Sequence, residues 1–146
     1  MRGIRTPLFT GYIVWLGAAC AGATAPGGSS GASGATARTV PADTPFTIAY
    51  GQEVTLAGSG LRLRFARLAE DSRCPTDVQC VWAGNARVGI RLQPGDTVAE
   101  LNTGVDPRTV THGGYVIELV ELTPRPARGR TPSPSEYVAT LRATRR

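Results

Sequence analysis

In the stretch LRLRFA, Leu61 to Ala66, large apolar side chains stand at every second position and arginines stand between them. Successive side chains of a β-strand point to opposite faces of a sheet. The alternation therefore predicts a strand whose Leu63 and Phe65 face a core while the arginines face water. Leu68 is out of phase with this pattern, which predicts a β-bulge or the end of the strand.

Similar short runs recur between turn residues, which is the pattern of an all-β sandwich or barrel. The stretch QPGD at 93–96 is a strong turn signal, and no stretch after residue 45 shows a helical period. We expect an all-β fold of about seven strands, a small antiparallel Greek-key-like sandwich, with a small β-barrel as the alternative. The runs lie at 46–50, 54–56, 61–65, 88–92, 98–101, 115–119 and 137–141.

The first twenty residues read as a secretory signal. Arg2 and Arg5 precede an apolar run, Leu8 to Ala19, that is too short to span a bilayer. The run ends in the sequence GAAC, which resembles the lipobox of bacterial lipoproteins, where a cysteine after small residues is diacylated. We expect Cys20 to carry lipid and to anchor the chain to a membrane, with a conventional signal-peptidase cut as the alternative.

The segment after Cys20 is rich in Gly, Ser and Ala. From Ala21 to Pro45 it holds almost no large apolar residue and cannot bury enough surface to offset the entropy of ordering. We expect a signal peptide at 1–20, a disordered linker at 21–45 that acts as a flexible tether, and a β-sandwich domain at 46–146.

The net charge of +5 comes from the C-terminal part of the chain. Thr123 to Arg146 contains six arginines and a single acid, Glu136. Its Pro-rich and Arg-rich segment, 123–134, predicts a long exposed loop that is either merely solvated or attracted to an anionic membrane or polysaccharide. Because no aromatic residues alternate with the arginines, we expect no nucleic-acid partner.

The chain has three cysteines, an odd number for an exported protein. If Cys20 carries lipid, Cys74 and Cys80 remain as one pair, which predicts a disulfide formed in an oxidising compartment. Their C-x5-C spacing matches neither the close pairs of zinc sites nor the C-x-x-C of thiol oxidoreductases. A metal-binding envelope protein remains an alternative.

The stretch DSRCPTDVQCVWAGNA, which begins at Asp71, is predicted to be a structural motif. Pro75 favours a turn, and Asp71 is placed to accept hydrogen bonds from nearby amides. Trp82 lies two residues beyond Cys80, so on a strand both would share one face and the indole would pack on the disulfide. Gly84 allows a turn or a bulge before the next strand.

This motif, DSRCPxxVxCxWxG, followed further along the chain by YxIxL and PxP, resembles a recurring family of small, uncharacterised secreted bacterial proteins, many with lipoprotein signals. The resemblance covers most of residues 46–146 and implies no activity. The matching residues are Asp71, Ser72, Arg73, Cys74, Pro75, Val78, Cys80, Trp82, Gly84, Tyr115, Ile117, Leu119, Pro124 and Pro126.

No pattern in the sequence points to catalysis. There is no G-x-S-x-G elbow, and His112 is the only histidine, in a predicted turn without a placed partner. We expect no enzyme, with no catalytic, cofactor-binding or metal residue, but an envelope module with a binding or structural role whose partner is a protein or an envelope polymer. The alternative is a proteinase-inhibitor-like module that presents the loop 74–80 as a preorganised reactive segment.

Overall fold

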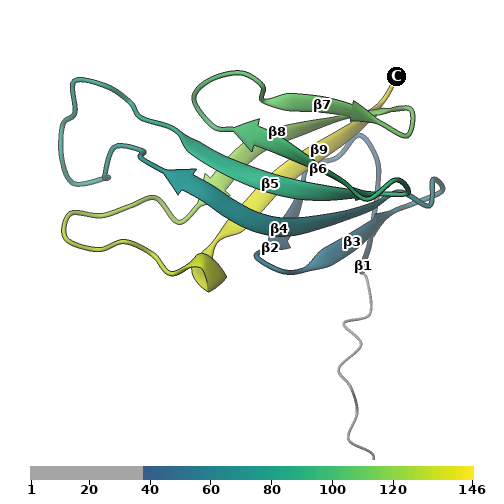
Figure 1. The fold of residues 1–146 in the computed structure, drawn as a ribbon, viewed down its shortest axis with the longest axis horizontal. Coiled ribbons are helices and arrows are strands. Elements are labelled where there is room, and N and C mark those ends of the chain that lie inside the picture. Colours follow the sequence, from purple (N-terminus) through teal and green to yellow (C-terminus); the bar gives the residue numbers. More distant parts are fainter. Residues whose placement is uncertain (1–37) are drawn as a thin grey trace, which may run out of the picture. The chain divides into compact units, whose positions relative to one another are not determined.

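The structure, a computed structural model, describes residues 38–146, which form two β-sheets packed face to face (Figure 1). One sheet has the strand order β1-β3-β4-β5-β6 and the other β2-β9-β8-β7. The two open sheets confirm an all-β sandwich rather than a closed barrel. The strands are β1 Arg38–Val40, β2 Phe46–Ala49, β3 Glu53–Leu56, β4 Arg62–Asp71, β5 Ala86–Gln93, β6 Thr97–Asn102, β7 Thr109–His112, β8 Tyr115–Thr123 and β9 Val138–Arg145, with a 3-10 turn at Pro134–Glu136.

Consecutive strands pair as antiparallel hairpins from β3 to β6 and from β7 to β9. β1 pairs with β3 rather than with β2, and β2 lies beside β9 although most of the chain separates them. This non-consecutive pairing is the Greek-key-like feature of the fold. The exception in direction is β1, which runs parallel to β3.

Two strands were not predicted. The strand β1 lies inside the segment 21–45, so the expectation of a disordered linker is wrong for its last residues: Val40 is buried, and residues 38–40 pair with β3. A single apolar residue in a polar tract gives no period that sequence patterns can detect. The signal peptide, Cys20 and the linker up to residue 37 lie outside the described residues.

The second unpredicted strand is β7. His112, expected in an exposed turn, is its last residue and is only partly exposed; its Nε2 lies 2.8 Å from the carbonyl oxygen of Pro94. The strand has only four residues, and two glycines follow it, so the turn signal outweighed the strand signal.

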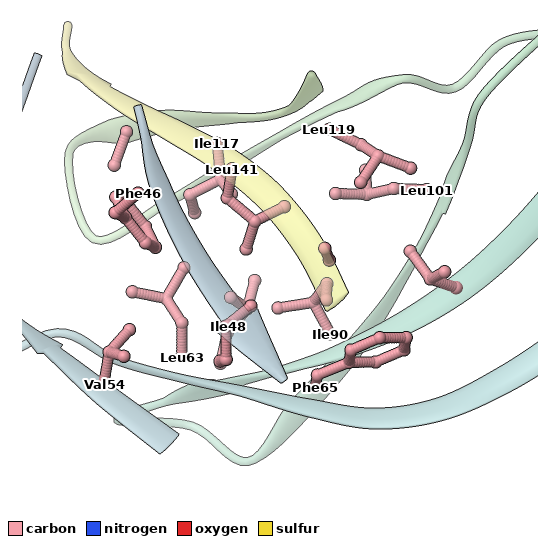
Figure 2. Close-up of a cluster of buried hydrophobic side chains, with 14 of the residues drawn as sticks. Phe46, Ile48, Val54, Leu63, Phe65, Ile90, Leu101, Ile117, Leu119 and Leu141 are labelled. Carbon is pink, nitrogen blue, oxygen red and sulfur yellow. The ribbon is translucent and has the colours of Figure 1, made fainter. Parts of the chain in front are cut away.

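The core lies between the sheets and follows the predicted alternation. Leu63 and Phe65 are fully buried, whereas the arginines between and beside them are exposed. Figure 2 shows Phe46 and Ile48 of β2, Leu63 and Phe65 of β4 and Leu141 of β9 among the buried side chains, with Phe46 and Leu141 paired across the β2–β9 ladder. The predicted break at Leu68 is confirmed, because register shifts occur on both sides of it in the β4–β5 ladder.

Three connections meet at one end of the sandwich, where β4, β6 and β8 finish. They are the β4–β5 loop (72–85), the β6–β7 loop (103–108) and the β8–β9 connection (124–137), and we refer to them together as the loop end. In Figure 1 the first and the third extend side by side at the left of the view. Residues 38–146 contain no helix long and apolar enough to cross a membrane.

Candidate functional site

The β4–β5 loop continues the pairing of its two strands. Beyond Asp71 the Ser72 N–H donates to the Asn85 carbonyl at 2.7 Å, and the Cys74 N–H donates to the Ala83 carbonyl at 2.9 Å. Backbone bonds of this kind fix both arms of a hairpin relative to each other. The loop is therefore an ordered extension of the sheet.

The predicted disulfide closes the tip of this extension. Cys74 and Cys80 are joined, with their Cα atoms 5.9 Å apart, which confirms their pairing. Pro75 begins the turn between them, and its carbonyl accepts a hydrogen bond from the Val78 N–H. In the chain-entropy model, closing so short a loop contributes about 2 kcal/mol by restricting the unfolded chain.

A buried cluster of three side chains, Asp71, Arg73 and Tyr137, fixes the base of the loop. The Asp71 carboxylate accepts from Arg73 Nε at 2.8 Å and from Arg73 NH2 at 2.7 Å, while the Tyr137 hydroxyl donates to its second oxygen at 2.7 Å. The side chains of Asp71 and Arg73 are only 5% and 10% exposed. The remaining Arg73 donors bond to the carbonyls of Leu122 and Pro124. One guanidinium thus joins the loop to β8 and to the connection that follows it.

This cluster changes the titration of two of its members. Burial of the Asp71 carboxylate by itself raises its pKa, but hydrogen bonds from the Arg73 side chain, from Tyr137 and from the Arg73 N–H, with the positive charge of Arg73, hold that pKa below its ordinary value of 3.8. Burial raises the pKa of Tyr137 to about 12, assisted by its hydrogen bond to Asp71 and by the carboxylate charge. At neutral pH the cluster holds a carboxylate, a guanidinium and a neutral phenol.

We expect Tyr137→Phe to lower the free energy of unfolding at neutral pH by about 1.5–3 kcal/mol, the usual contribution of a hydrogen bond to a charged group. The pH profile follows from linkage. The lowered pKa of Asp71 contributes fully to the free energy of unfolding above pH 3.8, and this contribution is lost as the pH falls below that value. The raised pKa of Tyr137 contributes fully below pH 10, and this contribution is lost as the pH rises towards 12.

Urea unfolding across this pH range measures both effects. In Tyr137→Phe, the decrease in the free energy of unfolding at high pH that comes from ionisation of the Tyr137 phenol should be absent. Tyr115→Phe is the matched control, because Tyr115 is also buried but its hydroxyl forms no hydrogen bond within residues 38–146. Equal destabilisation by both substitutions would show that the hydrogen bond to Asp71 contributes nothing beyond packing.

An asparagine network joins the β4–β5 loop to the β6–β7 loop. Asn85 donates from Nδ2 to Asn102 Oδ1 at 2.9 Å, and its own Oδ1 accepts from the Gly104 N–H at 2.9 Å. Asn102 is buried and donates from Nδ2 to the Pro107 carbonyl. Each buried polar group of Asn102 thereby has a partner, as a rigid connection requires.

The disulfide turn is also tied to the basic Pro-rich segment 123–134. The Thr76 N–H donates to the Pro126 carbonyl at 3.0 Å, and Asp77 Oδ1 accepts from the Arg128 N–H at 2.7 Å. The segment was predicted to be a long exposed loop, and its arginines are indeed exposed. It is nevertheless attached to the turn, and Pro132 is buried.

Trp82 does not occupy the predicted position. Residues 80–82 form no strand, and the Trp82 side chain is 82% exposed, so the expectation that it packs on the disulfide is wrong. Val81 beside it is 91% exposed. The immunoglobulin comparison requires a strand that continues through the second cysteine, but here the chain bends directly after Cys80. Two large apolar side chains therefore face solvent on a well-anchored loop.

Gly84 was predicted to allow a turn or a bulge, and it lies in the irregular segment between the bend at 81–82 and β5. It has φ +69°, in the left-handed region that glycine adopts without strain. A Cβ at this position would lie 1.9 Å from the Ser72 carbonyl oxygen, and a Cβ on Gly104 would lie 2.7 Å from the Gly84 oxygen. The two loops approach this closely because neither glycine carries a side chain.

Beside these glycines the loop end forms a cleft of about 370 Å³. The β4–β5 loop, the β6–β7 loop, the second half of β8 and the start of the β8–β9 connection supply its walls. Its lining includes Arg73, Ala83, Gly104, Arg108, Val120, Glu121 and Arg125. The sequence did not predict this group because its members are scattered over more than fifty positions, and only the surplus of arginine after residue 122 gave a signal.

The described residues 38–146 contain no group of three or more His, Cys, Asp and Glu side chains placed to hold a metal ion. Comparison of the chain with family models, with curated proteins and with solved structures finds no match. The case for a function therefore depends on the loop end itself.

Proposed function

We propose that the protein is an exported, lipid-anchored module of the bacterial cell envelope whose loop end binds a partner. The observation that carries this proposal is the exposure of Val81 and Trp82 on a loop fixed by a disulfide, a buried ion pair and an asparagine network. Neighbouring exposed apolar residues can mark an interaction site, and tryptophan is among the residues enriched in binding hot spots.

Rigidity is the second argument for binding. A flexible loop loses side-chain and backbone freedom when it is immobilised by a partner, whereas a preorganised one has lost that freedom during folding. The backbone bonds at Ser72 and Cys74 and the side-chain bonds of Arg73 fix the loop on both arms. The loop end therefore favours binding over a purely structural connection between two strands.

The inhibitor-like alternative rests on residues 74–80. In the structure they form a tight turn, and Asp77 accepts a backbone hydrogen bond from Arg128. A reactive segment that inserts into a proteinase is extended, like other peptides that add a strand to a partner. Val81 and Trp82, just beyond the disulfide, are the better-placed contact residues.

The anchor is tested by the mass of the chain from its native host. We expect a lipid-sized increment on Cys20 and membrane association that Cys20→Ser abolishes. An unlipidated chain that remains in the membrane fraction with Cys20→Ser would contradict a lipid anchor while leaving the binding surface in place.

Binding is tested by a photoreactive amino acid at position 82 in the native host. We expect a discrete covalent adduct from position 82. Position 59 is the control, because Ser59 is exposed in the turn before β4, at the opposite end of that strand from Asp71. No adduct at 82, or the same adduct at 59, would contradict the assignment of the loop end as the binding surface.

A further inference from the structure

The cleft of the loop end has an unusual charge distribution. Arg108 and Arg125 line it, and neither lies within 4.0 Å of an acidic group among residues 38–146. Arg73 at its floor is already neutralised by Asp71. Glu121 is the one acid in the lining, so two arginines without an ion pair face a single carboxylate.

Arginine is suited to anionic ligands that present paired oxygens. Its planar guanidinium offers paired N–H groups that match the oxygens of a carboxylate or of a phosphate. Arg108 is held close to β8, because its carbonyl accepts from the Leu119 N–H at 2.9 Å. Arg125 follows Pro124, whose carbonyl accepts from Arg73. Both guanidiniums thus extend from anchored backbone.

One exposed apolar side chain, Val120, lies among the residues that line the cleft. Val120 lies at the register shift between Leu119 and Glu121 in the β8–β9 ladder and is 37% exposed in the cleft wall. A bulge of this kind turns a side chain out of the regular pleat. Trp82 directly precedes Ala83, a lining residue, and Val105, 54% exposed, follows the lining residue Gly104. The cleft is therefore basic, with Val120 as an exposed apolar residue in its wall and two exposed apolar residues next in sequence to its lining.

We propose that this cleft binds an acidic segment of a partner protein, with carboxylates on Arg108 and Arg125 and apolar side chains on Val120 and Trp82. The inference rests on the proposed binding function and names its ligand. Aliphatic side chains with one exposed aromatic fit a peptide better than a sugar polymer, which stacks on several flat rings. A concave surface with Glu121 in it fits an anionic membrane poorly.

Trp82 provides the readout, because Trp15→Phe leaves it as the only tryptophan of the full chain. We expect a short peptide of alternating Glu and Leu to change Trp82 emission saturably, and the same peptide with Gln for Glu to bind at least about tenfold more weakly. Arg108→Gln and Arg125→Gln should each raise Kd by at least about tenfold. Arg64→Gln, an exposed β4 arginine outside the cleft, is the matched control and should leave Kd unchanged.

Equal binding of the Glu and Gln peptides, or cleft variants that fold and bind like the parent chain, would overturn the inference. So would saturable binding of alginate or of phosphatidylglycerol vesicles in place of the acidic peptide. In these cases an adduct from position 82 would show that the binding surface is correct and the ligand class is wrong. Absence of that adduct would instead refute the proposed function.

Discussion

Arg73→Ala is expected to lower the free energy of unfolding by about 3–5 kcal/mol, the usual effect of removing one partner from a buried ion pair. The substitution leaves the Asp71 carboxylate buried without its cation, and it leaves the carbonyls of Leu122 and Pro124 without a donor. Each of these groups then bears a desolvation penalty that the guanidinium had offset.

Urea unfolding followed by circular dichroism measures this loss. Arg62→Ala is the control, since Arg62 pairs with Glu53 at 3.7 Å on the surface and its side chain is largely exposed. An exposed pair contributes about 1 kcal/mol or less. A loss at Arg73 no larger than the loss at Arg62 would contradict the view that the buried cluster holds the loop.

Gly84→Ala is expected to destabilise the protein by about 2–5 kcal/mol, from left-handed backbone strain of about 1–2 kcal/mol and overpacking of about 1–3 kcal/mol. The new Cβ would lie 1.9 Å from the Ser72 carbonyl oxygen, a backbone atom that no rotamer change can move. Relief requires the two arms of the loop to separate, which breaks the bond between the Ser72 N–H and Asn85.

Gly58→Ala separates the two contributions. Gly58 has a nearly identical φ of +70°, but a Cβ there meets nothing within 4 Å. The Gly58→Ala variant should show only the backbone strain. Thermal or urea unfolding should therefore show that Gly84→Ala is clearly less stable than Gly58→Ala. Equal losses would mean that the close approach of the two arms is relaxed in solution.

Sequence patterns predicted the strands with clear period-two alternation. Leu63 and Phe65 are in the core as expected, and the last predicted strand has Ala139 and Leu141 buried. The missed strands, β1 and β7, have three and four residues and contain one buried or half-buried apolar side chain each. Their stability comes from pairing with β3 and β8, which a local pattern does not contain.

The site was predictable only where its chemistry is local. The disulfide follows from a short motif and is confirmed. The partnership of Asp71 with Tyr137 joins residues 66 positions apart, so no spacing within the motif could reveal it. This distant contact helps to fix the base of the loop, whereas Trp82 is exposed outside the core.

The exposure and mobility of Trp82, measured by its fluorescence in the full chain carrying Trp15→Phe, show directly whether the loop end is preorganised. We expect a tryptophan that acrylamide quenches almost as well as a free indole, and whose fluorescence anisotropy decays only with the tumbling of the whole domain. Such a combination would identify an exposed side chain on a rigid support. A shielded indole, or rapid depolarisation on the timescale of loop motion, would contradict the claim that the loop end presents a preorganised binding surface.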